Sequence, residues 1–145
     1  MALSMSRLER EEFLADLHVG VMGVNEPGRA PLTVPVWYSY RPGGLVSVIT
    51  GDGSQKARRV AEAGRFSLCA QTETAPYRYV SVEGPVVATD RPVDPGERRA
   101  VAYRYLGPEI GDLYLAATAE RAAENCVIRM APEHWRTADF AKELG

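Results

Sequence analysis

Two short turn signals near the N-terminus constrain the fold of this chain more than any other feature. They separate three apolar segments, at 19–25, 31–40 and 45–50, that we predict to be strands. The turns are Glu26-Pro27-Gly28 and Arg41-Pro42-Gly43-Gly44. Parallel strands need a crossover of about a dozen residues or more, so these connections predict an antiparallel meander and disfavour a parallel α/β fold.

The rest of the chain adds strands and helices to this meander. Strands are expected over 66–71, 77–89, 126–130 and 135–138, and helices over 6–17, 54–64, 94–106 and 110–123. Gly84-Pro85 predicts a bulge that bends the longest strand, as barrels require. In the last helix, Leu113 and Ala117 are expected to face inward. The pattern predicts a mainly β, closed or half-closed barrel with peripheral helices, in a single domain over residues 1–145.

Composition and charge limit the partners of the protein. A net charge of −2 over 145 residues gives no positive field to attract nucleic acid or an anionic membrane. No apolar run approaches the ~18 residues of a membrane span, and the polar N-terminus is not typical of a secretory signal. We therefore expect a cytoplasmic protein. Cys69 and Cys126 are expected to be buried free thiols, and neither they nor His18 and His134 have the spacing of a metal site.

The stretch from Leu45 to Arg59 is the strongest candidate for a binding site. An apolar strand runs into a glycine-bracketed turn, which opens a helix whose first turns carry Ser54, Gln55, Lys56, Arg58 and Arg59. Free backbone N–H groups at a helix N-terminus, together with a lysine, suit a phosphate group. The same residues also fit a purely structural interpretation, in which Asp52 caps the helix and the arginines are solvated.

The sequence holds no motif for self-sufficient catalysis, such as a nucleophile elbow or a Walker lysine. If the protein is an enzyme, a bound cofactor is expected to carry the chemistry, and no catalytic residue is assigned. Pro35 in mid-strand is expected to lie at a sheet edge, at a bulge or beside a ligand. The ring of the nearby Trp37 either lines a flat aromatic ligand or packs in the core. Three arginines of a later helix are expected to be solvated unless they line the same mouth as Lys56: Arg98, Arg99 and Arg104.

Four segments in a fixed order, PLTVPVWY, LVSVITG, SQKARR and YVSVEG, resemble the pyridoxamine 5′-phosphate oxidase-like, flavin-binding split-barrel superfamily. The resemblance covers roughly residues 10–135. The G-S-Q-K-A run that follows a strand is most similar to the deazaflavin branch, whose members use coenzyme F420 in actinobacteria. The resemblance implies a six-stranded antiparallel split barrel that forms a homodimer, with two cofactors at the interface.

The resemblance also implies which residues hold the cofactor. Three residues would offer backbone groups along the flavin or deazaflavin ring: Pro35, Val36 and Trp37. Three would cover the ribityl chain: Ile49, Thr50 and Gly51. Four would hold the phosphate: Ser54, Gln55, Lys56 and Arg59. Two tyrosines would come from the partner subunit: Tyr77 and Tyr79.

We therefore expect a flavin- or deazaflavin-dependent oxidoreductase that transfers a hydride between reduced F420 and a small organic acceptor. FMN is the alternative cofactor, and a non-catalytic carrier of flavin or haem is the alternative function. True pyridoxamine phosphate oxidases carry an Arg-Lys pair where this chain has Gln55-Lys56, so that activity itself is not expected. No metal, nucleic acid or membrane partner is expected.

Overall fold

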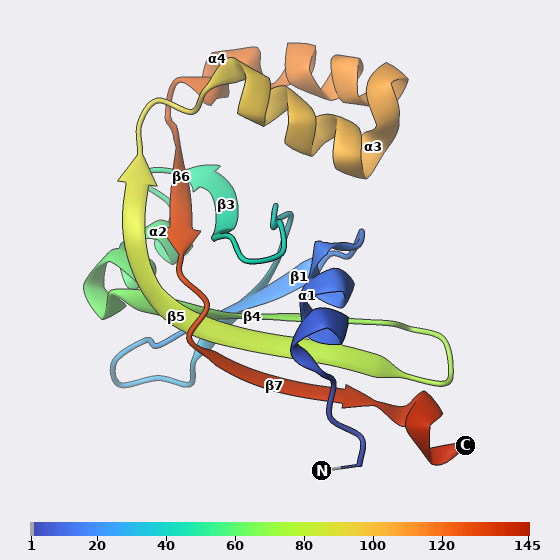
Figure 1. Cartoon of the computed structure of the whole chain (residues 1–145). Coiled ribbons are helices and arrows are strands. Elements are labelled where there is room, and N and C mark those ends of the chain that lie inside the picture. The colour runs from blue at the N-terminus through green and yellow to red at the C-terminus, as the bar shows by residue number, and fades with distance from the viewer. Residues whose placement is uncertain (1) are drawn as a thin grey trace.

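A computed structural model describes residues 2–145 and shows seven antiparallel strands with helices at their margins (Figure 1). The strands are β1 (Gly20–Val24), β2 (Leu32–Val36), β3 (Val46–Gly51), β4 (Arg65–Gln71), β5 (Arg78–Asp90), β6 (Asn125–Met130) and β7 (His134–Asp139). Their hydrogen-bonded order is β2-β1-β4-β5-β6-β3, and β7 also pairs with β5. The predicted elements are therefore present, and most of their ends differ by one or two residues. The strand expected over 31–40 stops at Val36, and the helices expected over 94–106 and 110–123 fall largely within one element, at 95–117.

The long strand β5 is shared by two layers of sheet. Its first part pairs with β4 and β7, whereas the part from Val86 to Asp90 pairs with β6. The register shifts between Val86 and Ala88, so the strand has the expected bulge, but just after Gly84-Pro85 and not at that pair. Gly84 lies at this bend, where a Cβ atom would come within 1.7 Å of the Ala131 carbonyl oxygen. The curved path of β5 in Figure 1 turns one sheet into a half-barrel.

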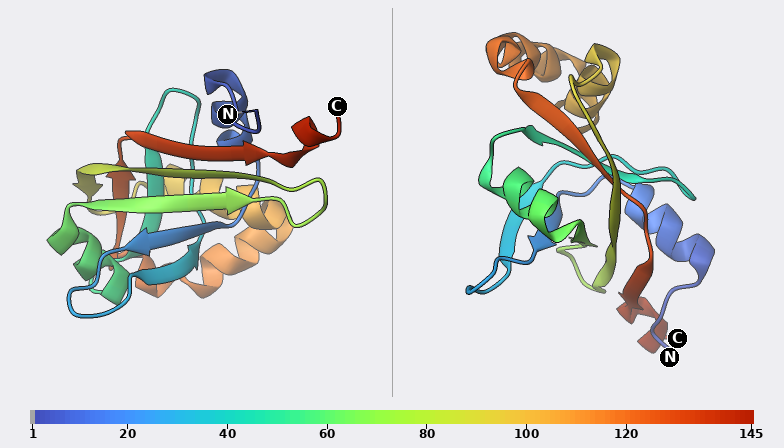
Figure 2. Two further views of the ribbon diagram at one scale, coloured as in Figure 1. Left: turned by 90° about the horizontal axis from the view of Figure 1, so that it is seen from below. Right: turned by 90° about the vertical axis from the view of Figure 1, so that its left-hand side faces the viewer.

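The core fills the space between the two layers. Met22 and Leu68 point inward from the layer β7-β5-β4-β1-β2, and Val48 and Ile128 point inward from the layer β5-β6-β3; all four side chains are buried. The two views of Figure 2 show how the layers curl around this interior. The expectation of a mainly β, antiparallel half-barrel with peripheral helices is confirmed.

The predicted meander is only half right. β1 and β2 pair across a tight turn, in which Arg29 N–H donates to the Glu26 carbonyl (3.0 Å) and Gly28 has a φ of +76°. In contrast, β3 pairs along its whole length with β6 and meets the chain after β2 only at Ser39 and Ser47. A tight turn keeps two segments close, but long-range pairing decides which strand each one joins. β2 lies at the edge of the sheet, which is one of the three positions that Pro35 allowed.

Three helices begin within one residue of where the local signals placed them. Helix α1 (Arg7–Ala15) starts with a capping box between Ser6 and Glu9. Helix α2 (Gln55–Ala63) runs from the Ser54 N-cap to Gly64, which has left-handed backbone angles. Helix α3 (Pro95–Ala117) starts at the Asp94 N-cap. The short helices α4 (Ala119–Ala122) and η1 (Phe140–Glu143) complete the set.

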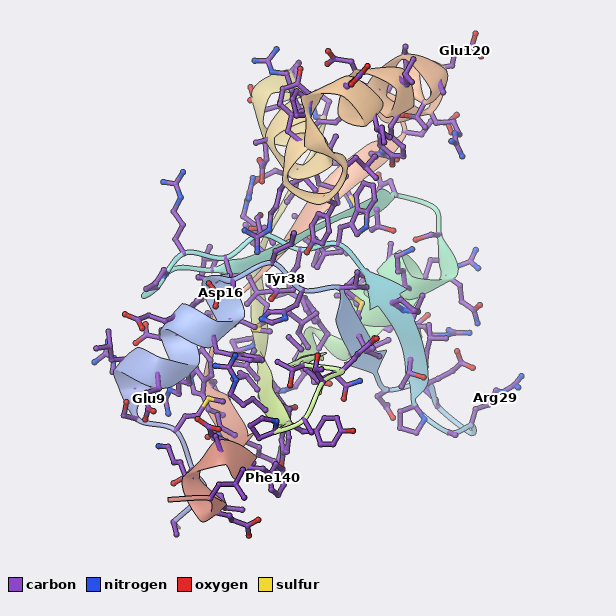
Figure 3. All side chains as sticks on the ribbon, turned by 90° about the vertical axis from the view of Figure 1, so that its right-hand side faces the viewer. Glu9, Asp16, Arg29, Tyr38, Glu120 and Phe140 are labelled. Carbon is purple, nitrogen blue, oxygen red and sulfur yellow. The ribbon has the colours of Figure 1, made fainter. Side chains whose placement is uncertain are left out.

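Gly107 divides α3 into two arms, because its φ of 77° and ψ of 167° are not helical. The arms fold back on each other above the barrel (Figure 1), and we call α3 and α4 together, residues 95–122, the helical hairpin. The expectation that Leu113 and Ala117 face inward is wrong, since both are exposed on the second arm. Figure 3 shows Glu120 at the far end of the hairpin and Tyr38 in the middle of the molecule.

Charged and aromatic contacts fasten the first arm of the hairpin to the barrel. Arg129 donates two hydrogen bonds of 2.8 Å to Glu97, and Arg104 donates to the carbonyls of Ala15 and Asp16. The hydroxyl of Tyr105 donates to the His18 carbonyl (2.7 Å). The hairpin is thereby held over β3 and β6, on the side away from the interior.

The remaining sequence-based expectations concern single residues. Both cysteines are free thiols; Cys126 is buried, whereas Cys69 is only half-buried. Within residues 2–145, no helix has the length and apolar character needed to cross a membrane. In the same part of the chain, no three His, Cys, Asp or Glu side chains gather into a metal-binding group.

Candidate functional site

A cavity of about 460 Å3 lies between the strand–turn–helix segment and the helical hairpin. One wall is the outer side of β3 and β6, the floor is the turn into α2, and the opposite wall is the hairpin. Six of the residues predicted for a cofactor site line this one cavity: Trp37, Ile49, Thr50, Gly51, Ser54 and Lys56. The structure therefore brings together residues from three separate elements.

The end of the cavity at α2 is built to receive an anion. Ser54 caps the helix by accepting from Ala57 N–H (3.2 Å), and its hydroxyl also meets the Thr50 hydroxyl at 3.2 Å. Lys56 is half-buried and, within residues 2–145, makes no hydrogen bond or ion pair. A positive helix end beside an uncompensated ammonium group favours a phosphate.

The alternative in which Asp52 caps α2 is wrong. The Asp52 carboxylate instead accepts two hydrogen bonds from Arg91, at 2.6 and 2.8 Å. This guanidinium holds the pKa of Asp52 below its usual value. Asp52 therefore stays ionised and paired, and it does not neutralise Lys56.

Two of the predicted phosphate ligands point elsewhere. Gln55 Nε2 donates to the Glu26 carboxylate (3.1 Å), and Arg59 Nε donates to the same carboxylate (3.3 Å). Arg59 also pairs with Glu62. These bonds hold both side chains against the buried Glu26, and neither side chain lines the cavity. Among the predicted phosphate ligands, Ser54 and Lys56 line the cavity.

The other end of the cavity is aromatic. The ring of Trp37 stacks on Tyr105 with centroids 5.0 Å apart and planes 5° apart, and Tyr114 meets the Trp37 ring at 5.3 Å. The Tyr105 hydroxyl, which donates to the His18 carbonyl, also accepts from Tyr38 N–H at 3.1 Å. The backbone just after Trp37 is thus already paired with the hairpin.

Four further predicted site residues do not line the cavity. Pro35 is exposed on the edge strand, and Val36 is buried in the core beneath it. Tyr77 and Tyr79 are exposed at the start of β5, on the outer side of the sheet. Their predicted place in the site of a partner subunit stays a prediction.

The hairpin contributes residues that sequence reasoning left open or missed. Of the three arginines in question, Arg98 lines the cavity, Arg99 is exposed, and Arg104 holds the hairpin to α1. Tyr114, Thr118 and Arg121 also line the cavity. No local signal marks these three, because their position depends on the reversal at Gly107.

Taken together, the cavity fits a flat, phosphorylated cofactor. It combines an anion-binding helix end, an unpaired lysine and an aromatic side chain at the opposite end. Such a group would supply redox chemistry that the side chains of this cavity do not.

Comparison with solved structures shows the same fold in other proteins. A conserved hypothetical protein from Mycobacterium tuberculosis superposes with a TM-score of 0.75 at 22% identity, over 99% of this chain and 91% of that one. An F420 reductase gives a TM-score of 0.71 at 18% identity, over 87% of this chain and 94% of that one. A FAD and heme binding protein from Mycobacterium smegmatis gives 0.66 at 18% identity, over 96% and 73%.

No protein-family model and no curated protein matches the sequence. The structural similarity alone assigns the fold, and that fold is the split barrel found in flavin-binding proteins.

Proposed function

We propose that this protein is an oxidoreductase that binds a flavin-type cofactor in the cavity between α2 and the helical hairpin. The observation that carries the proposal is the half-buried Lys56 beside the N-terminus of α2, which forms no ion pair or hydrogen bond with residues 2–145 and faces an aromatic wall across the same cavity. The fold shared with an F420 reductase and a FAD and heme binding protein supports the same class of ligand.

Reduced F420 is the cofactor we favour, and FMN is the alternative. When bound, either would supply the hydride for reduction of a small organic acceptor. Ser54 and Lys56 would hold the phosphate, and Ile49, Thr50 and Gly51 would cover the chain that leads to the ring, which would lie toward Trp37. Gln55 and Arg59 would first have to leave Glu26 before they could contribute.

A homodimer belongs to this proposal, with Tyr77 and Tyr79 of each copy near the site of the other. Support comes from apolar side chains that the single chain leaves uncovered. Val19 and Val21 are exposed on the outer face of the sheet, a face with no helix across it in the left view of Figure 2. Ile110 and Leu113 are exposed on the hairpin. Neighbouring apolar side chains that stay exposed on one face are a feature of protein–protein interfaces.

Titration of the purified protein with FMN and with F420, followed by fluorescence, tests the proposal. Lys56→Gln is expected to raise the dissociation constant by about 10- to 100-fold, which corresponds to the ~1.5–3 kcal/mol of a charged hydrogen bond. Arg58→Gln is the matched control, because it removes the same charge from the same helix but does not line the cavity. The proposed site would be contradicted if neither FMN nor F420 binds, or if the two variants have equal effects on the dissociation constant.

A carrier without catalytic activity is the second candidate, because one protein with this fold is described as binding FAD and heme. Turnover separates the two. An enzyme is expected to oxidise reduced cofactor many times over in the presence of a reducible acceptor, whereas a carrier would release its cargo unchanged.

A further inference from the structure

The cavity is lined by more positive charge than one phosphate requires. Besides Lys56, it is lined by Arg98 from the first arm of the hairpin and by Arg121 from α4. Within residues 2–145, no carboxylate forms an ion pair with any of these three side chains. Two acidic residues also line the cavity, Asp52 and Glu124. Asp52 is already bound by Arg91, so Glu124 is the one lining carboxylate without an ion pair among residues 2–145.

Arg98 is held in place by only part of its guanidinium group. Its Nη2 donates to the Leu115 carbonyl (3.2 Å) and to the Thr118 hydroxyl, which ties the first arm to the end of the second. The Nε and Nη1 groups have no acceptor among the described residues. A guanidinium carries five N–H donors, so a half-buried side chain keeps three of them available beside the cavity.

A purely structural role would explain only the Nη2 contacts of Arg98. A cation near the end of a helix is favourable in itself, and these two bonds would serve that purpose. They do not account for the position of Arg98 in the wall of a cavity that Lys56 also lines, nor for Arg121 in the same lining. The free donors of the half-buried Arg98 and of the exposed Arg121 remain solvated without a ligand, so they can donate to an anion that enters the cavity.

We infer that Arg98, with Arg121, forms a second anion-binding subsite of the cavity, so that the ligand carries a carboxylate in addition to the phosphate held at Lys56. This inference rests on the proposed function for the identity of the flavin-type ligand. A planar guanidinium suits a carboxylate, because two parallel N–H donors match its two oxygens. The subsite gives the cavity a preference for F420, which carries carboxylates beyond its phosphodiester, over FMN, which ends in one phosphate.

The first test compares the two cofactors on two variants. Arg98→Gln is expected to raise the dissociation constant of F420 at least tenfold and that of FMN less than threefold. Arg99→Gln, a neighbouring exposed arginine outside the lining, is the control and is expected to change neither. A circular dichroism melt of each variant reports whether the hairpin is still folded. Equal effects of Arg98→Gln on both cofactors, or no effect on either, would overturn the inference.

The second test does not depend on flavin binding. It follows thermal unfolding with 3-phosphoglycerate and with glycerol 3-phosphate, which differ in a carboxylate. The wild-type midpoint is expected to rise more with 3-phosphoglycerate, and Arg98→Gln is expected to abolish that difference while Arg99→Gln retains it. Equal midpoints in the wild type would overturn the second subsite. If neither F420 nor FMN binds but this difference is seen, the proposed function fails and the subsite stands.

Discussion

At the scale of single residues, Glu26 determines which cations are free to bind a ligand. Its buried carboxylate accepts from Gln55 and Arg59 and also pairs with Arg29 at 3.4 Å. Lys56, one position beyond Gln55, lies on another side of α2 and has no such partner within residues 2–145. The basic character of this helix is therefore less important for binding than the position of one lysine.

Glu9 gives a residue-scale prediction about pH. Its pKa is lowered to about 2, first by the hydrogen bond from the Ser6 backbone and next by Lys142, which lies 2.9 Å away. A carboxyl with a depressed pKa stabilises the folded state above its unfolded pKa, and this stabilisation is lost as the pH falls through the folded pKa. Most of the change is thus expected between pH 4.5 and pH 2.

Unfolding curves at a series of pH values check this prediction. Wild type is expected to be more stable than Glu9→Gln near pH 6, and the difference is expected to shrink steadily as the pH approaches 2. Glu12→Gln serves as the control, because Glu12 lies exposed on the same helix. A Glu9→Gln curve that stays parallel to wild type throughout would show that the contacts of Glu9 do not affect its pKa.

At the scale of elements, the bend in β5 sets the shape of the barrel. The strand pairs with β4 and β7 before the bend and with β6 after it. The chain that returns from β6 passes so close to the bend that only a glycine fits at position 84. This bend places β6 and β3 under the hairpin, and hence forms the wall of the cavity.

Gly84→Ala is expected to destabilise the protein by about 1–3 kcal/mol or more, the usual cost of overpacking. The physical reason is that the new Cβ would lie 1.7 Å from the Ala131 carbonyl oxygen, a backbone atom that has to move. Urea unfolding measures the loss. Gly53→Ala is the control, since no atom lies within 4 Å of its added Cβ, and a change within ~0.5 kcal/mol is expected there. Equal stability of the two variants would show that the bend relaxes freely.

At the scale of the whole molecule, the hairpin leaves an apolar stripe uncovered. Ile110, Leu113 and Tyr114 follow helical spacing, and Leu113 is 69% exposed. Tyr114 also lines the cavity. The stripe is therefore continuous with the proposed cofactor site, which is the arrangement expected if a second copy of the chain covers both.

Leu113→Glu is expected to convert a dimer into a monomer, because it places a charge in the centre of this stripe. Light scattering coupled to size-exclusion chromatography measures the change in mass. Arg99→Glu alters charge at an exposed position of the same hairpin away from the stripe and is expected to leave the dimer intact. A wild-type protein that is monomeric at micromolar concentration, or a Leu113→Glu variant that stays dimeric, would contradict the prediction.

Much of the candidate site could be predicted from local sequence. The strand–turn–helix from β3 to α2, the Ser54 position and Lys56 follow from short-range signals, and six predicted residues line one cavity. The hairpin wall could not be predicted, because Arg98, Tyr114 and Arg121 meet the cavity only through the reversal at Gly107 and long-range packing on Trp37.

The sequence by itself determined the elements and their local ends. Turn residues, helix caps and the alternation along β2 act within a few residues of chain, so their effect can be derived without a partner. Only the tertiary structure decided that β3 pairs with β6, that Glu26 holds Gln55 and Arg59, and that the hairpin encloses Lys56. These outcomes depend on contacts between residues far apart in the chain, where burial and charge pairing outweigh local preference.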